Sequence, residues 1–109
     1  MASDLRKGIN EGWFREVNER LEHRAAEKAP PDGQFEILCE CDEEECTERI
    51  AISFLEYEAV RADPRAFIAL AGHVDTTCER VVYGRDRYEV VQKLGEAGMI
   101  AEIENPRAG

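Results

Sequence analysis

This chain of 109 residues lacks several features that would assign it to a broad functional class. It contains no run of about 18 apolar residues, so we predict no membrane-spanning segment. Residues 1–8 hold neither an apolar core nor a small-residue cleavage site, and a secretory signal is therefore not expected. Internal repeats and low-complexity tracts are also absent. These absences favour a cytoplasmic protein, in a compartment where thiols stay reduced and disulfides are rare.

Motifs of known catalytic centres are missing as well. The sequence has no His-Glu-x-x-His, and the deaminase pairing of His-x-Glu with Pro-Cys-x-x-Cys is absent. The glycines of Gly95–Gly98 lack the Gly-Lys-Ser/Thr ending of a phosphate-binding loop. With two histidines in the whole chain, no Ser/His/Asp or Cys/His arrangement is recognisable. We therefore predict that the protein is not an enzyme.

Positive charge is scarce in one part of the chain. The formal net charge is −10, and residues 30–58 carry −9 of it, with ten acidic residues against Arg49 alone. Residues 1–29 are balanced, and residues 59–109 carry −1. Nucleic-acid-binding proteins usually show a basic patch, so direct nucleic-acid binding is disfavoured. The acidic run of residues 42–45 is typical of a solvated loop; the alternative is a contact for a basic partner protein or a second cation.

Against these absences stand four cysteines, three of which are crowded into Cys39-x-Cys41-x4-Cys46. His73 and Cys78 follow further along the chain. Thiolates gathered so densely in a chain without a secretory signal usually hold a metal. Three cysteines with a histidine, or four cysteines, indicate tetrahedral Zn²⁺. The alternative interpretations are buried free thiols and a disulfide.

The fourth ligand is predicted to be His73, because it follows a glycine at the end of a predicted buried strand, and Cys78 is the competing candidate. Four ligands close the coordination shell, whereas catalytic zinc usually keeps an open position. Three thiolates also weaken the metal as a Lewis acid. We therefore predict a structural zinc site with Cys39, Cys41, Cys46 and His73 as its ligands.

Residues 1–29 are predicted to form an N-terminal amphipathic helix, from about Asn10 to Lys28. Apolar residues recur every four positions in this segment: Ile9, Trp13, Val17, Leu21 and Ala25. The segment 29–33, with its two prolines, ends the helix. Trp13 and the adjacent Phe14 are expected to dock on the core; the alternative is that they anchor a partner helix or a dimer.

Residues 30–109 are predicted to form a zinc-bound α+β domain, in one folding unit with the helix. Alternation over residues 34–41 predicts a strand that places Cys39 and Cys41 on one face, and Glu36 and Glu40 on the other. Further strands are expected over residues 50–53, 66–71, 81–83 and 88–94.

One inserted helix is predicted between the second and third strands. Ser53-x-x-Glu56 matches the capping box that begins a helix, and Asp63-Pro64 is a signal that ends one. From Gly95 onward the sequence shows a weak apolar segment. The predicted fold class is α+β, with a small, mostly antiparallel sheet of four or five strands stapled by zinc.

Several short motifs follow one another along most of the chain: Phe14–Arg20 in the helix, then Cys39-Glu-Cys41-x4-Cys46, Glu56–Arg61, Pro64–Phe67, Gly72-His73 and Glu79–Val82. In this order the chain resembles a family of small uncharacterised proteins of high-GC Gram-positive (actinobacterial-type) bacteria. It departs from the family in Pro64–Phe67, where the family tends to place arginine directly before phenylalanine. Cys78 is not a position of the family pattern, which favours His73 as the fourth ligand. The resemblance implies the fold and the site, and it implies no activity.

These inferences predict a small cytoplasmic zinc-binding protein that acts as a protein-interaction or regulatory module. Its contact surface is expected to be the helix with Trp13 and Phe14, or the acidic loop of residues 42–45. The alternative is a thiol-based redox or metal sensor, in which oxidation of the three cysteines ejects zinc and releases a partner. The identity of the partner and the oligomeric state stay open.

Overall fold

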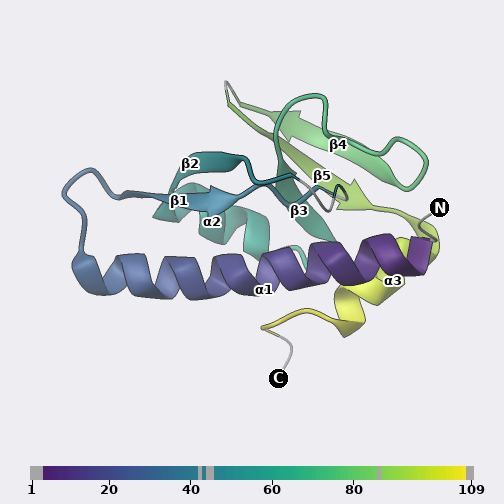
Figure 1. Ribbon diagram of the computed structural model, residues 1–109, viewed down its shortest axis with the longest axis horizontal. Helices are drawn as coiled ribbons and strands as arrows, with labels where there is room; N and C mark the ends of the chain where they lie inside the picture. Colours follow the sequence, from purple (N-terminus) through teal and green to yellow (C-terminus); the bar gives the residue numbers. More distant parts are fainter. Residues whose placement is uncertain (1–3, 42, 44–45, 86, 108–109) are drawn as a thin grey trace.

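Three helices flank and separate two groups of strands in a computed structural model that describes residues 4–41, 43, 46–85 and 87–107 (Figure 1). Their order is α1 (Asp4–Lys28), β1 (Gln34–Leu38), β2 (Arg49–Ser53), α2 (Phe54–Arg61), β3 (Ala66–Ala69), β4 (Glu79–Gly84), β5 (Glu89–Lys93) and α3 (Gly95–Ile103). The strands form two small antiparallel sheets, one of β1 and β2 and one in the order β3-β5-β4. The predicted α+β class is confirmed.

The predicted inserted helix is α2, and its ends lie where local chemistry places them. The Ser53 hydroxyl accepts a hydrogen bond from the Glu56 amide at 3.1 Å, and the Glu56 carboxylate accepts one from the Ser53 amide at 3.3 Å. This reciprocal pair satisfies two amide groups that a helix start leaves unpaired. The helix ends at Arg61, two residues before the Asp63-Pro64 signal.

The helix α1 differs from its prediction in its start and in the face that it buries. It begins at Asp4, and its buried side chains include Arg15 and Asn18, while Trp13 is 60% exposed. The expectation that Trp13 docks on the core is therefore wrong. Because 3.6 residues make one helical turn, each step of four residues advances the side-chain direction by about 40°. The four-residue stripe thus turns around the helix and cannot keep facing one neighbour.

A buried arginine docks α1 on the rest of the molecule. The guanidinium of Arg15 donates hydrogen bonds to the carbonyls of Pro64 at 2.7 Å and Ala101 at 2.8 Å. It also lies over the ring of Phe67, 4.7 Å from the ring centre. Ala101 is in the last turn of α3, where carbonyls have no partner within the helix. Arg15 therefore joins α1 to α3 and to the turn before β3.

The C-terminal helix α3 was predicted only as a weak apolar segment. Its N-cap residue, Leu94, forms no side-chain cap, so the sequence carries no start signal there. Gly98 faces the end of β5 so closely that an added Cβ would lie 2.8 Å from the carbonyl oxygen of Lys93 and 2.6 Å from the Arg65 guanidinium. The glycine lowers helix propensity but permits this close packing.

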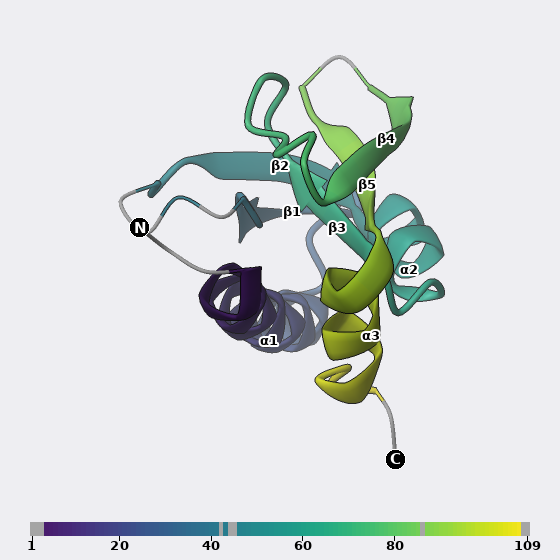
Figure 2. The same cartoon turned by 90° about the vertical axis from the view of Figure 1, so that its right-hand side faces the viewer.

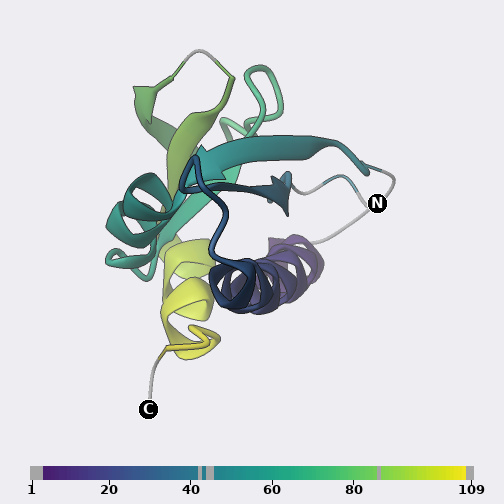
Figure 3. The ribbon, with the colours of Figure 1, turned by 90° about the vertical axis from the view of Figure 1, so that its left-hand side faces the viewer.

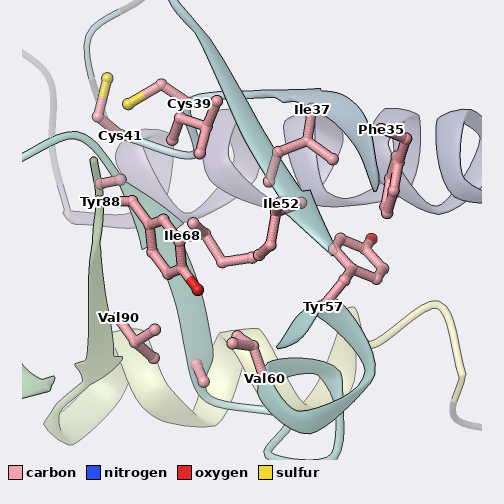
Figure 4. Packing of buried hydrophobic residues seen from close by; sticks show 13 residues of the cluster. Phe35, Ile37, Cys39, Cys41, Ile52, Tyr57, Val60, Ile68, Tyr88 and Val90 are labelled. Atoms are coloured by element: carbon pink, nitrogen blue, oxygen red, sulfur yellow. The ribbon is translucent and has the colours of Figure 1, made fainter. Parts of the chain in front are cut away.

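The main hydrophobic core runs along β1, from Phe35 at one end to Cys39 and Cys41 at the other (Figure 4). It is completed by residues of the neighbouring elements, among them Ile50, Ile52, Tyr57, Val60, Ile68 and Val90. Views along α1 show α1 and α3 on one side of the strands and the β4–β5 hairpin extending away on the other (Figures 2 and 3). Among the described residues, no helix combines the length and apolar character needed to cross a lipid bilayer.

Candidate metal centre

Cys39, Cys41, Cys46 and His73 converge at one end of the core. Their ligand atoms, one from each side chain, all lie within 4.8 Å of one another. The Nδ1 atom of His73 is 3.7 Å from the Sγ atoms of both Cys39 and Cys46. A tetrahedron with metal–sulfur bonds of about 2.3 Å and a metal–nitrogen bond of about 2.1 Å has edges of about 3.6–3.8 Å. The two distances from His73 to sulfur match such edges, and the four side chains lie near enough to one another to hold a metal ion.

The two thiols of the Cys-x-Cys pair lie just beyond β1 instead of on it, because the strand ends at Leu38. The Cys39 amide donates to the Glu48 carbonyl at 3.0 Å, so the backbone still follows β2 at this point. Figure 4 shows the sulfur atoms of Cys39 and Cys41 side by side at the end of the core. The predicted strand over residues 34–41 is thus too long. The prediction that Cys39 and Cys41 point to the same side is correct.

The other two side chains reach the centre from turns. Cys46 follows the acidic loop, of which residues 42, 44 and 45 lie outside the described residues, and its amide donates to the Glu43 carbonyl at 3.1 Å. His73 follows β3 through a turn in which its amide donates to the Leu70 carbonyl at 3.0 Å. Gly72 has a φ of 88°, a conformation that favours glycine. The Gly-His sequence therefore turns the imidazole toward the thiols.

A hydrogen bond to sulfur links the two strand ends that meet here. The amide of Leu70, just after β3, donates to the Sγ atom of Cys39 at 3.3 Å. Such N–H donors stabilise a thiolate and help to hold it in a metal site. Cys39 and Cys41 are buried, whereas Cys46 and His73 are partly exposed. The centre therefore lies at the margin of the core, with one side open to solvent.

In the protein without metal, Cys41 and Cys46 favour their neutral thiol form. A hydrogen bond with Cys39, together with burial, raises the pKa of Cys41 well above its ordinary value. Burial also raises the pKa of Cys46. Crowded thiolates repel one another, and a divalent cation would supply the missing positive charge and displace their protons. The four side chains could therefore hold a cation in exchange for these protons.

Cys78 does not take part in this group. Among the described residues, the set of ligand atoms within 4.8 Å comprises the three crowded cysteines and His73. Cys78 is buried just before β4, where its carbonyl accepts a hydrogen bond from the Leu94 amide at 2.8 Å. The structure therefore brings together the four predicted ligands and leaves the competing candidate outside.

A buried carboxylate lies directly behind the two cysteines, and the sequence pattern did not reveal its role. Glu40 was predicted only to face away from the thiols, and it does, but it is 0% exposed. Its carboxylate accepts hydrogen bonds from Arg61 at 2.6 and 3.0 Å and from the Ile68 amide at 2.9 Å. Burial by itself would lower the pKa of Arg61, but its neighbours, Glu40 foremost among them, together raise that pKa. The segment 39–41 is therefore anchored on both of its sides.

Asn18 joins this buried network from α1. Its amide nitrogen donates to the Glu40 carboxylate at 2.7 Å and to the Leu38 carbonyl at 2.9 Å, and its amide oxygen accepts from the Leu38 N–H at 2.8 Å. The side chain thus pairs with the end of β1 much as a neighbouring strand would. Arg15 and Asn18, three residues apart in a helix, share one face, and this spacing is the signal that could have indicated a buried polar stripe.

Comparisons of the chain with protein-family models, with curated proteins and with solved structures find no significant match. The resemblance to small proteins of high-GC Gram-positive bacteria therefore stays a prediction. The metal centre stands on the spacing of its residues in the sequence and on their convergence in space.

Proposed function

We propose that this chain is a zinc-binding protein whose metal centre holds the fold together and lets it act as a protein-interaction or regulatory module. The observation that carries the proposal is the convergence of three thiols and one imidazole within 4.8 Å. Thiolate and imidazole ligands in a tetrahedral arrangement favour Zn²⁺ over hard cations such as Mg²⁺ and Ca²⁺.

A structural role fits the way in which the site connects the chain. The ion would tie the end of β1, the loop that leads to β2 and the turn after β3, all of which carry ligands. Zinc supplies an apparent ~10–16 kcal/mol in zinc-finger peptides, which is comparable to the whole stability of a typical domain, ~5–15 kcal/mol. A closed set of four protein ligands leaves no position for a substrate, so we propose that the protein is not an enzyme.

The contact surface that we propose is the aromatic pair on α1, formed by the exposed Trp13 and the partly exposed Phe14. Trp13 is 60% exposed, and its ring packs edge-on against that of Phe14 at 5.3 Å between ring centres. Exposed tryptophan is enriched at the energetic centres of protein interfaces. The acidic loop of residues 42–45 stays the alternative contact surface, and its residues 42, 44 and 45 lie outside the described residues.

Metal analysis of the purified protein tests the proposal. We expect one zinc ion per chain, and we expect a strong chelator to remove it with loss of the native circular dichroism signal and of cooperative thermal unfolding. A metal-free protein with unchanged circular dichroism and melting temperature would contradict a structural role.

The partial exposure of Cys46 favours a second candidate, a thiol-based redox or metal sensor. An oxidant can reach this thiol more easily than the buried Cys39 and Cys41. In that case low peroxide should release zinc, and a thiol reductant should restore binding. Zinc that is retained, or lost irreversibly with unfolding, would support the structural role instead.

A further inference from the structure

Three carboxylates from two helices surround one guanidinium on the side of the molecule that carries the C-terminal tail. Glu19 and Glu22 belong to α1 and Glu58 to α2, and together they form what we call the guanidinium site. Its occupant is Arg107, from the segment that follows α3 and turns back beneath the middle of α1 (Figure 1). Residues far apart in the sequence thus meet in one polar contact.

The contacts of this guanidinium are numerous and directional. Arg107 Nε lies 3.2 and 3.1 Å from the two carboxylate oxygens of Glu19. Its two terminal nitrogens bind the Glu58 carboxylate in a bidentate manner at 3.0 and 2.5 Å, and Nη2 is 3.4 Å from Glu22. A planar fork of donors opposite carboxylates is the geometry that selects arginine over lysine.

The site is built into the two helices and holds more negative charge than its occupant neutralises. Glu19 is oriented by the Tyr57 hydroxyl, which donates to it at 3.1 Å. Three carboxylates face one guanidinium, so two negative charges remain uncompensated when all are ionised. Burial, with the neighbouring Glu58, accordingly raises the pKa of Glu22 to about 7.

Arg107, by contrast, belongs to a segment that is largely exposed to solvent. The side chain of Arg107 is 33% exposed, and residues 102–104 and 106–107 are exposed to solvent. Arg107 and its three carboxylate partners lie outside the hydrophobic core clusters, so the contact can open while the core stays packed. A site shaped by packed helices is therefore filled by a residue from an exposed tail.

We propose that the guanidinium site binds an arginine side chain of a partner protein, and that Arg107 occupies it within the chain as an exchangeable plug. The proposal rests on the proposed role as an interaction module and names the chemistry of the partner: an arginine-bearing peptide segment. We choose an arginine-bearing partner because of charge complementarity. The site has three carboxylates for one guanidinium, and the chain as a whole has a net charge of −10. The tail competes at the effective concentration of a short linker, on the order of millimolar.

The test compares full-length, zinc-loaded wild-type protein with Arg107→Ala, using a fluorescent peptide, acetyl-Asn-Pro-Arg-Ala-Gly-amide, as the probe. Fluorescence anisotropy should show about tenfold tighter binding to Arg107→Ala, because the competing tail side chain is gone. A peptide with lysine in place of arginine should bind more weakly, since it cannot form the bidentate contact. Arg85→Ala, which removes an exposed arginine of the β4–β5 hairpin, should leave binding at the wild-type level.

A double variant, Arg107→Ala with Glu58→Gln, tests whether the peptide binds at this site. The tighter peptide binding expected for Arg107→Ala should be lost in the double variant. Equal binding to wild-type protein and Arg107→Ala, or equal binding of the arginine and lysine peptides, would overturn the proposal and leave Arg107 as a structural clamp. Metal content and circular dichroism are measured on every variant. If the peptide results contradict the proposal while each variant keeps one zinc per chain and a native spectrum, only the guanidinium site is refuted. Loss of zinc or of the native spectrum would instead concern the zinc site.

Discussion

Glu40 and Arg61 form a buried bidentate ion pair directly behind the candidate metal centre, with side chains that are 0% and 2% exposed. Since Glu40 lies between Cys39 and Cys41, one short segment presents thiols to one side and a carboxylate to the other. The metal site and the ion pair therefore hold the same stretch of backbone. Loss of either should weaken the other.

Replacement of Glu40 by glutamine should destabilise the protein by about 3–5 kcal/mol, because Arg61 would keep a buried charge without its partner. Urea unfolding of the zinc-loaded protein measures this change. Glu36→Gln removes the same charge from an exposed position on β1 and should change stability by less than about 0.5 kcal/mol. Equal effects of the two substitutions would show that the ion pair contributes nothing specific.

The assignment of the fourth ligand predicts different results for two cysteine substitutions. Cys41→Ser should lower the zinc content or affinity and the melting temperature together, since a serine hydroxyl is a poor replacement for a thiolate ligand. Cys78→Ser should keep one zinc per chain, because Cys78 lies outside the ligand group. Metal analysis after dialysis against a weak chelator checks both. Loss of zinc from Cys78→Ser with native circular dichroism would contradict the assignment.

The raised pKa of Glu22 leads us to expect that the stability of the protein depends on pH. Burial and the neighbouring Glu58 raise this pKa from the ordinary value of 4.5 to about 7. The folded protein therefore holds a proton that the unfolded chain releases, and this group disfavours folding increasingly as pH rises between these two values. Glu22→Gln removes the penalty, so its melting temperature should exceed that of the wild type at about pH 8 by more than at about pH 5.

Thermal unfolding of both proteins at the two pH values supplies the measurement for Glu22. Glu16→Gln serves as the control, since Glu16 pairs with Arg20 on the exposed face of α1. A difference in melting temperature that is the same at both pH values would show that Glu22 does not titrate in this range.

Ala29, which follows α1, offers a stabilising substitution. Its φ is 46°, in the left-handed region that costs an L-residue about 1–2 kcal/mol, and this is the position where helices commonly place glycine. Ala29→Gly should stabilise the protein by about 0.5–1 kcal/mol, or a few degrees in melting temperature. Ala26→Gly, inside the last turns of α1, should destabilise it by up to about 1 kcal/mol. Thermal unfolding should show a gain in stability for Ala29→Gly and a loss for Ala26→Gly. Changes of the same sign would refute the explanation from the backbone conformation of Ala29.

Features that depend on near neighbours in the chain were predictable. The capping box of Ser53 and Glu56 and the stop before Pro64 involve groups within a few residues of one another, so their chemistry needs no tertiary partner. The three clustered thiols were predictable because cysteines so close together in the chain indicate a shared metal, whereas His73 was inferred from its place after a glycine at the end of a predicted strand.

Features that depend on what packs against an element were not predictable. Trp13 was expected in the core, but Arg15 is buried in its place. The reason is that α1 meets polar carbonyls at the turn before β3 and at the end of α3, and Arg15 donates hydrogen bonds to them. α3 itself has no capping signal, and Gly98 is explained only by the close approach of β5.

The amino-acid sequence by itself therefore determined the α+β class, the helix α2 and the identity of the three thiols and the imidazole that converge. Only the tertiary structure decided which side of α1 is buried and that Glu40 faces Arg61 and Asn18 behind the metal centre. The physical reason is the distance along the chain over which each effect acts. Periodicity and capping act within a few residues, whereas the burial of a charged group depends on partners that folding brings from distant parts of the chain.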